Sequence, residues 1–176
     1  MRVRPEHVAC AAILAALCVP AGAQTLESAQ APREIQAGIE GKHPAAYLIL
    51  ANKLFAAGDR DRAVFWFYLG QLRYRTHLRA RPTLPSHADP ALFGSLFETV
   101  GPRINAYAFG DVPGLARTLD RVLAWDAAHD DTYTPKDRTA PERAEVREGL
   151  VRLRDDILAR QDEIRADRAR VGLENR

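Results

Sequence analysis

Four aromatic residues stand in succession near the middle of this chain: Phe65, Trp66, Phe67 and Tyr68. Successive residues of a helix are turned by about 100°, so four neighbours point in every direction around the axis. A surface helix buries one stripe, whereas a helix that is apolar all round is enclosed by other elements. The segment from Arg60 to Leu78 is therefore predicted to be the central helix of the domain, with its arginine-rich end emerging from the core.

The residues before this helix predict a second helix and a tight turn. Pro44 suits the first turn of a helix, and Gly58 and Asp59 suit a helix end followed by the N-cap of the next helix. Between them an apolar stripe recurs at helical spacing: Tyr47, Leu50, Ala51 and Leu54. Residues 44–78 are thus predicted to form a helical hairpin.

The later segments also follow the helical period, and no segment alternates as a strand does. Asp89 and Pro90 form an N-cap and first-turn pair, and the helix that they open is expected to break or kink at Gly101–Pro102. The predicted fold class is all-α, a compact helical domain of five or six helices.

The chain is expected to hold one domain. Residues 24–34 are polar and alanine-rich and predict a flexible N-terminal segment, and residues 35–176 predict a single helical domain. Thr139 and Glu142 have the spacing of a capping box. They open a long, charged C-terminal helix over residues 140–170, whose charges favour a solvated face.

The hairpin of residues 44–78 resembles one tetratricopeptide unit, or the related Sel1-type repeat. An aromatic residue, a Leu-small pair, a Gly-Asp turn and a second Ala-aromatic-small series stand at matching spacing: Tyr47, Leu50–Ala51, Leu54, Gly58–Asp59, Ala63, Phe67 and Gly70. Only one good unit is present, so a closed helical domain is expected in place of a solenoid. The resemblance implies a scaffold that binds another protein or peptide.

The first 23 residues have the pattern of a secretory signal peptide. Arg2 and Arg4 precede an apolar run over residues 8–19, and cleavage is expected after Ala23. This run is shorter than the roughly 20 residues that span a bilayer. A lipoprotein anchored through Cys18 is the less favoured alternative, because the bulky Leu17 precedes that cysteine. The predicted location is the periplasm or the outside of a bacterial cell.

Composition narrows the range of partners. Both cysteines, Cys10 and Cys18, lie in the segment expected to be removed, so the core alone must stabilise the mature domain. The 25 basic and 23 acidic side chains are interspersed, unlike the concentrated basic face of a nucleic-acid-binding protein. The expected partner is another envelope protein or peptide, with no nucleic acid and no membrane span after signal removal.

No motif for catalysis, cofactor binding or metal binding stands out. Nucleophile elbows, phosphate-binding loops and dinucleotide fingerprints are missing from the sequence, and no two histidines are spaced i,i+4 on a helix. The loop residues His87, Asp89, His129 and Asp131 are interpreted as solvated. No cofactor and no metal site are therefore predicted. The alternative is a cell-envelope hydrolase that uses a carboxylate in a helical cleft, for which Glu98 is the candidate.

Four residues of the aromatic helix form the candidate partner-binding patch: Tyr68, Gln71, Tyr74 and Arg75. Arginine beside tyrosine is typical of protein-binding surfaces, although arginine stems also cover apolar helices without binding a partner. The predicted function is that of a non-catalytic exported scaffold or protein-interaction module. An immunity or inhibitor-type protein is a specific form of this hypothesis.

Overall fold

The computed structural model describes residues 30–176, and this part of the chain is helical, without strands, as the sequence predicts. The proposed signal peptide lies outside the described residues. The described part has seven α-helices and two short 3-10 turns, one or two α-helices more than predicted: α2 (Pro32–Gln36), η1 (Ile39–Gly41), α3 (Ala45–Ala56), α4 (Arg60–Arg79), α5 (Asp89–Ala108), α6 (Val112–Ala128), η2 (Lys136–Arg138), α7 (Ala140–Ala159) and α8 (Gln161–Arg170).

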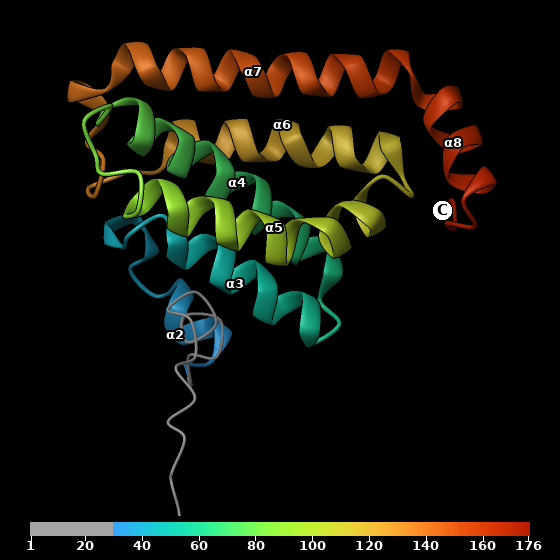
Figure 1. Ribbon diagram of the computed structural model, residues 1–176, viewed down its shortest axis with the longest axis horizontal. Helices are drawn as coiled ribbons and strands as arrows, with labels where there is room; N and C mark the ends of the chain where they lie inside the picture. The colour runs from blue at the N-terminus through green and yellow to red at the C-terminus, as the bar shows by residue number, and fades with distance from the viewer. Residues whose placement is uncertain (1–29) are drawn as a thin grey trace, which may run out of the picture.

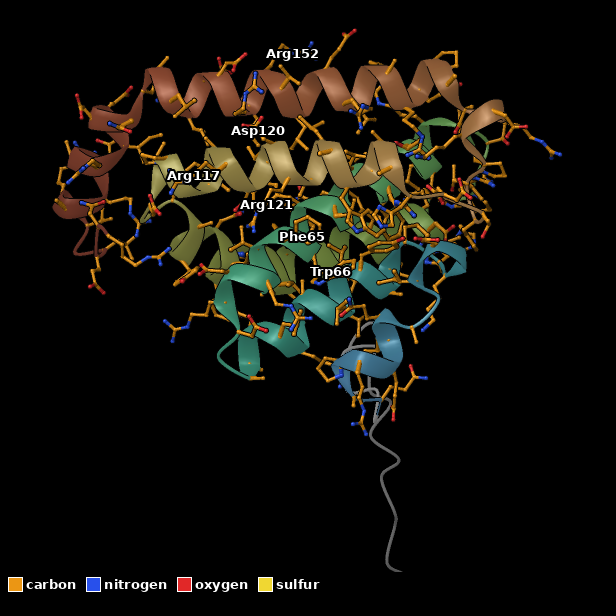
Figure 2. All side chains as sticks on the ribbon, turned by 180° about the vertical axis from the view of Figure 1, so that it is seen from behind. Phe65, Trp66, Arg117, Asp120, Arg121 and Arg152 are labelled. Carbon is orange, nitrogen blue, oxygen red and sulfur yellow. The ribbon has the colours of Figure 1, made fainter. Side chains whose placement is uncertain are left out.

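Helix α4 is the centre of the domain, as its four aromatic residues predict. It contacts α3, α5, α6 and α7. Trp66, Phe67 and Tyr68 are buried, and Phe67 is fully enclosed. Phe65 is half-buried, and the guanidinium of Arg121 on α6 lies 6.0 Å from its ring centroid (Figure 2). The apolar side chains around α4 therefore supply the surface on which four other helices pack.

Helices α3 and α4 form the predicted hairpin and approach each other closely. Gly58 has φ 86°, a left-handed conformation that favours glycine at the turn. At Gly70 a Cβ atom would lie 2.9 Å from Cβ of Tyr47 and 3.0 Å from a methyl group of Leu48. The absence of a side chain at this position thus sets the distance between the two helices.

The sequence predicts a break or a kink at Gly101–Pro102, and α5 continues through both residues, so the helix is not broken there. Proline removes a single backbone donor, the one that would bond the carbonyl of Glu98. Glu98 is exposed, so water can reach this turn. On the opposite side Val100 and Ile104 are fully buried, and their packing keeps the helix continuous.

The C-terminal segment is two helices, not the single helix predicted over 140–170. Helix α7 runs beside α6 along one side of the molecule, and α8 turns away at its end (Figure 1). The break is at Arg160, whose φ of −106° and ψ of 17° leave the helical region. The capping box is also absent, because the Thr139 hydroxyl donates to the carbonyl of Pro135.

One side of the C-terminal half of α4 stays in the core, whereas Arg75 and Arg79 are exposed, so the prediction that this end emerges is wrong for Arg73. Arg73, Thr76 and His77 are each no more than 2% exposed. Arg73 belongs to a buried group that we call the arginine–aspartate cluster, made by Arg73, Asp126, Asp131, Arg143 and Arg147. Arg73 and His77 remain inside because each pairs with an aspartate, and Thr76 because its hydroxyl donates to the carbonyl of Leu72.

Within residues 30–176, none of the helices combines the length and the apolar character that crossing a membrane requires.

Candidate functional site

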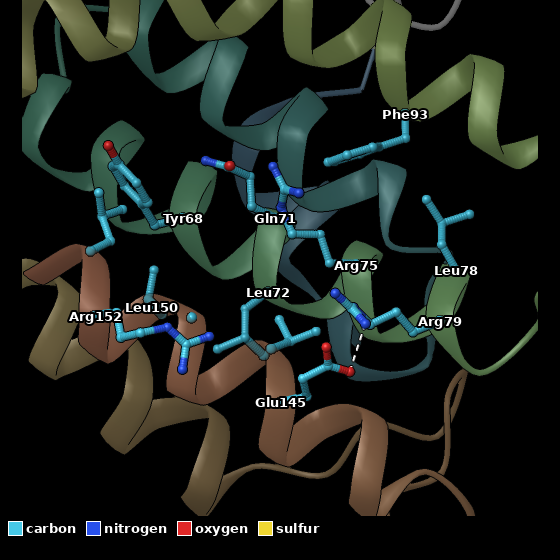
Figure 3. A pocket seen from close by; sticks show the side chains of 13 residues that line it. Tyr68, Gln71, Leu72, Arg75, Leu78, Arg79, Phe93, Glu145, Leu150 and Arg152 are labelled. Atoms are coloured by element: carbon cyan, nitrogen blue, oxygen red, sulfur yellow. Dashed lines mark hydrogen bonds and ion pairs between the residues drawn. The ribbon is translucent and has the colours of Figure 1, made fainter.

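An open groove of about 600 Å³ lies between α4 and α7. We call it the α4–α7 groove. Its volume is within the range of small-ligand and peptide side-chain pockets. Three helices supply the lining (Figure 3): Tyr68, Gln71, Leu72, Arg75, Leu78 and Arg79 from α4, Phe93 from α5, and Glu145, Val146, Gly149, Leu150, Arg152 and Leu153 from α7.

The groove combines apolar side chains with a charged rim. Leu72 is buried, and the remaining aliphatic side chains and Phe93 are partly open to solvent. Around them stand Arg75, Arg79, Arg152 and Glu145, three positive charges and one negative. Arg79 donates to Glu145 at 2.6 Å, and this ion pair bridges α4 and α7 across the opening (Figure 3). The rim therefore keeps an excess of positive charge.

Arg75 is the rim residue whose charge is least compensated. Among the residues that the structure describes, it forms no ion pair with a carboxylate. Its guanidinium carbon lies 5.3 Å from the ring centroid of Phe93 and 5.9 Å from that of Phe97. Burial, together with the charge of Arg79, lowers the pKa of Arg75. A carboxylate brought to this position would oppose this lowering of the pKa, because an opposite charge favours the charged guanidinium.

The predicted partner-binding patch is only partly accessible. Gln71 and Arg75 line the groove, and Tyr68, although 4% exposed, forms part of its wall. Tyr74 is fully buried and donates its hydroxyl to the carbonyl of Asp89 at 3.2 Å. The prediction of an exposed Tyr74 is therefore wrong, because Tyr74 lies on a different side of α4 and faces the start of α5.

The arginine–aspartate cluster fixes α7 against the rest of the domain and so positions the far wall of the groove. The two carboxylates, Asp126 of α6 and Asp131 of the following loop, are nearly inaccessible to solvent. Arg73 donates to Asp126 at 3.3 Å and to the Tyr47 hydroxyl at 2.7 Å. Arg143 of α7 binds both aspartates. Four elements are thus joined through two buried carboxylates.

A second polar site lies at the end of the α3–α4 hairpin. His43 precedes α3, His77 is in the last turn of α4, and Asp89 is the first residue of α5. Nε2 of His43 is 3.3 Å from one oxygen of Asp89, and Nε2 of His77 is 2.7 Å from the other. We call this group the histidine–aspartate cluster. Asp89 was predicted as an N-cap and a solvated loop residue, but its carboxylate holds two imidazoles together.

Neighbouring donors fix the protons of both rings. The Ala45 backbone N–H points at Nδ1 of His43, 3.1 Å away, and Arg81 donates to Nδ1 of His77 at 2.8 Å. Each Nδ1 is therefore an acceptor, and each Nε2 carries the proton that it donates to Asp89.

Burial lowers the pKa of His77. Burial alone would raise the pKa of Asp89, but hydrogen bonds from the two histidines hold it below its usual value.

Sequence reasoning missed this cluster because it searched for histidines along one helix. The signal lay in the hairpin itself. In an antiparallel pair of helices, the start of the first and the end of the second lie side by side. His43 stands just before the predicted first helix and His77 just before the predicted end of the second. The hairpin alone predicts that the two histidines lie close together. The position of Asp89 depends on the path of the loop between α4 and α5, which the hairpin does not determine.

The alternative catalytic residue is not in a cleft. Glu98 is exposed on α5 and does not line the α4–α7 groove. Of the loop residues interpreted as solvated, His87 is exposed as predicted. Asp131, by contrast, belongs to the arginine–aspartate cluster, and the His129 ring stacks on Trp125 at 3.9 Å.

Comparison with known proteins gives one relative and no family. A protein of Haemophilus influenzae that is described as uncharacterized is 34% identical over 86 residues, which are 49% of this chain and 33% of that protein. The match thus spans about a third of the relative's length. No protein-family model matches the chain. No solved structure matches it significantly.

Proposed function

We propose that this protein is an exported, non-catalytic helical module that binds a peptide segment of another cell-envelope protein in the α4–α7 groove. The expected segment carries bulky apolar side chains next to a carboxylate. Export rests on the signal-peptide pattern of residues 1–23. The resemblance of residues 44–78 to a tetratricopeptide unit supports the same class of function, since such units belong to scaffolds that bind proteins and peptides.

The uncompensated charge of Arg75 is the observation that carries this proposal. It stands at an apolar groove, packed on the rings of Phe93 and Phe97 and near the positive Arg79. A guanidinium binds a carboxylate through two parallel hydrogen bonds, and such pairs are strong where water is partly excluded. The aliphatic side chains that line the groove can pack against the apolar side chains of the peptide beside that carboxylate.

Selection of random peptides displayed on phage against the purified protein tests this proposal. Peptides enriched by the wild type should combine an acidic residue with neighbouring bulky apolar residues. Arg75→Glu should reverse the charge preference and weaken binding of the original peptides by about tenfold or more, since each tenfold in affinity is about 1.4 kcal/mol.

Arg117→Glu is the matched control, because it makes the same charge change on α6, at a side chain that is 72% exposed and outside the groove (Figure 2). This variant should select the same peptides as the wild type. If no peptide class is enriched, or if Arg75→Glu and Arg117→Glu behave alike, the groove is not the binding site.

A further inference from the structure

The histidine–aspartate cluster has the composition of a metal site. One atom from each of His43, His77 and Asp89 lies within 4.8 Å of the other two. Imidazole nitrogen and carboxylate oxygen are the ligands that zinc uses beside thiolate, and three protein ligands leave a fourth position for water. None of the three residues lines the α4–α7 groove, so the cluster is a separate site.

The surroundings of the cluster combine fixed ligands with an open side. The side chain of His77 is 2% exposed, whereas those of His43 and Asp89 are 29% and 25% exposed. The ring of Tyr133 packs against both imidazoles, with centroid distances of 5.0 Å to His43 and 5.3 Å to His77. An ion can therefore enter from solvent and meet side chains whose positions are already held by packing.

We propose that His43, His77 and Asp89 form a binding site for a divalent transition-metal ion of the zinc class. The ion takes the place of the two Nε2 protons that now point at Asp89. Each imidazole stays neutral, because its proton moves from Nε2 to Nδ1. The three groups then supply two nitrogens and one carboxylate oxygen to a single ion.

The proton shift identifies two residues that oppose metal binding. The Nδ1 proton of His77 gains an acceptor in the Thr134 hydroxyl, 3.3 Å away, but Arg81 must swing aside. The Nδ1 proton of His43 displaces the hydrogen bond from the Ala45 N–H at the start of α3. Arg81→Ala should therefore strengthen metal binding by about tenfold, because it removes a positive charge close to a divalent ion.

The test is calorimetric titration of zinc chloride into the full chain, freed of metal with EDTA, at a slightly alkaline pH. Cys10 and Cys18 are replaced with serine in every protein, so that no thiolate contributes. One zinc ion per chain is expected to bind. Cobalt(II) in place of zinc should give the visible absorption bands of a four-coordinate ion. His43→Ala and Asp89→Asn should each weaken zinc binding by at least about 100-fold, the upper end of what loss of a supporting residue costs.

His87→Ala is the matched control, because His87 is an exposed histidine two residues from Asp89. It should bind zinc as the wild type does. A second measurement follows the amide resonance of Ala45, which should shift on zinc addition because its hydrogen bond is lost. This site is independent of the groove, so its failure would leave peptide binding untouched.

Three outcomes would overturn the proposal. These are no stoichiometric binding of zinc by the wild type, equal zinc affinity in the His43→Ala and His87→Ala proteins, or an Ala45 resonance that zinc leaves unchanged. Any of them would leave the cluster as a hydrogen-bonded clamp between the α3–α4 hairpin and α5. Circular dichroism of each variant separates loss of metal binding from loss of fold.

Discussion

Arg143 of α7 holds the buried Asp126 of α6 through a single guanidinium nitrogen, which lies 2.9 and 3.1 Å from the two carboxylate oxygens. The other terminal nitrogen donates to Asp131 at 2.8 Å. Arg143→Ala would leave both buried carboxylates short of a partner, and removing one member of a buried ion pair costs about 3–5 kcal/mol. Denaturant unfolding followed by circular dichroism should show a loss near the lower end of that range, since Arg73 and Arg147 still bind Asp126.

Arg152→Ala is the control on the same helix. This arginine is 65% exposed, and among residues 30–176 its ion-pair partner is Glu148, which is 70% exposed. The free energy of unfolding should therefore change by less than about 0.5 kcal/mol. Equal losses in the two variants would mean that the arginine–aspartate cluster does not hold α7 in place.

The close approach of α3 and α4 at Gly70 gives a second prediction. In Gly70→Ala the new methyl group meets the Tyr47 Cβ, which cannot move without its backbone. Overpacking of this kind costs about 1–3 kcal/mol, more than the gain of roughly 1 kcal/mol from alanine's helix propensity. Thermal unfolding should show a lower melting temperature.

Gly94→Ala makes the same change where there is space. Gly94 lies within α5, and nothing comes within 4 Å of a Cβ placed there. This variant should be more stable than the wild type by up to about 1 kcal/mol. A stabilised Gly70→Ala protein would show that the two helices can separate without loss.

The central position of α4 makes Trp66 a large contributor to stability. Its ring is enclosed by those of Tyr47, Phe65 and Trp125, at centroid distances of 5.3 to 6.0 Å. Trp66→Ala should cost about 3–5 kcal/mol in chemical denaturation. Phe65→Ala should cost less, because part of that ring remains in water. A loss below about 1 kcal/mol for Trp66→Ala would contradict the central role of α4.

Tyr68 makes the free energy of unfolding depend on pH in the alkaline range. Burial raises the pKa of its phenol above the ordinary value, and the hydroxyl donates to Asn105 at 3.0 Å. The unfolded chain therefore loses this proton first. The contribution of Tyr68 to the free energy of unfolding is constant below about pH 10 and falls as the pH rises further.

Tyr68→Phe tests this linkage. At neutral pH the variant should be less stable by about 1 kcal/mol, since it loses one hydrogen bond. Above pH 10 its stability should fall less steeply than that of the wild type, by up to about 1.4 kcal/mol per pH unit for the one phenol removed. Parallel pH profiles for the two proteins would show that Tyr68 ionises equally easily in both states.

The features predicted correctly from the sequence depend on local pattern. The central position of α4 follows from four adjacent aromatic rings, and the turn of the hairpin follows from Gly58. Both can be predicted because each depends on only a few neighbouring residues. The break at Arg160 was missed, since neither glycine nor proline marks it. Pro102 does not break α5, because buried side chains on the far side of that helix keep it intact.

The candidate sites depend on contacts that no local pattern contains. Arg73 was expected to emerge into solvent because its partner Asp126 is 53 residues away in the sequence. Arg75 was expected in a binding patch and does line the groove, while Tyr74, one position earlier, turns inward. Successive side chains of a helix are turned by about 100°, so Tyr74 and Arg75 point to different sides of α4. The packing of the neighbouring helices determines which of these sides is exposed to solvent.

Tyr47 contributes to three contacts at once. Its Cβ lies against the bare backbone of Gly70, and its hydroxyl accepts a hydrogen bond from Arg73 and donates one to the carbonyl of Ile39. Helix spacing and internal charge balance are therefore coupled through one phenol ring. A substitution that widens the hairpin and moves Tyr47 would therefore also remove an acceptor from the buried guanidinium of Arg73.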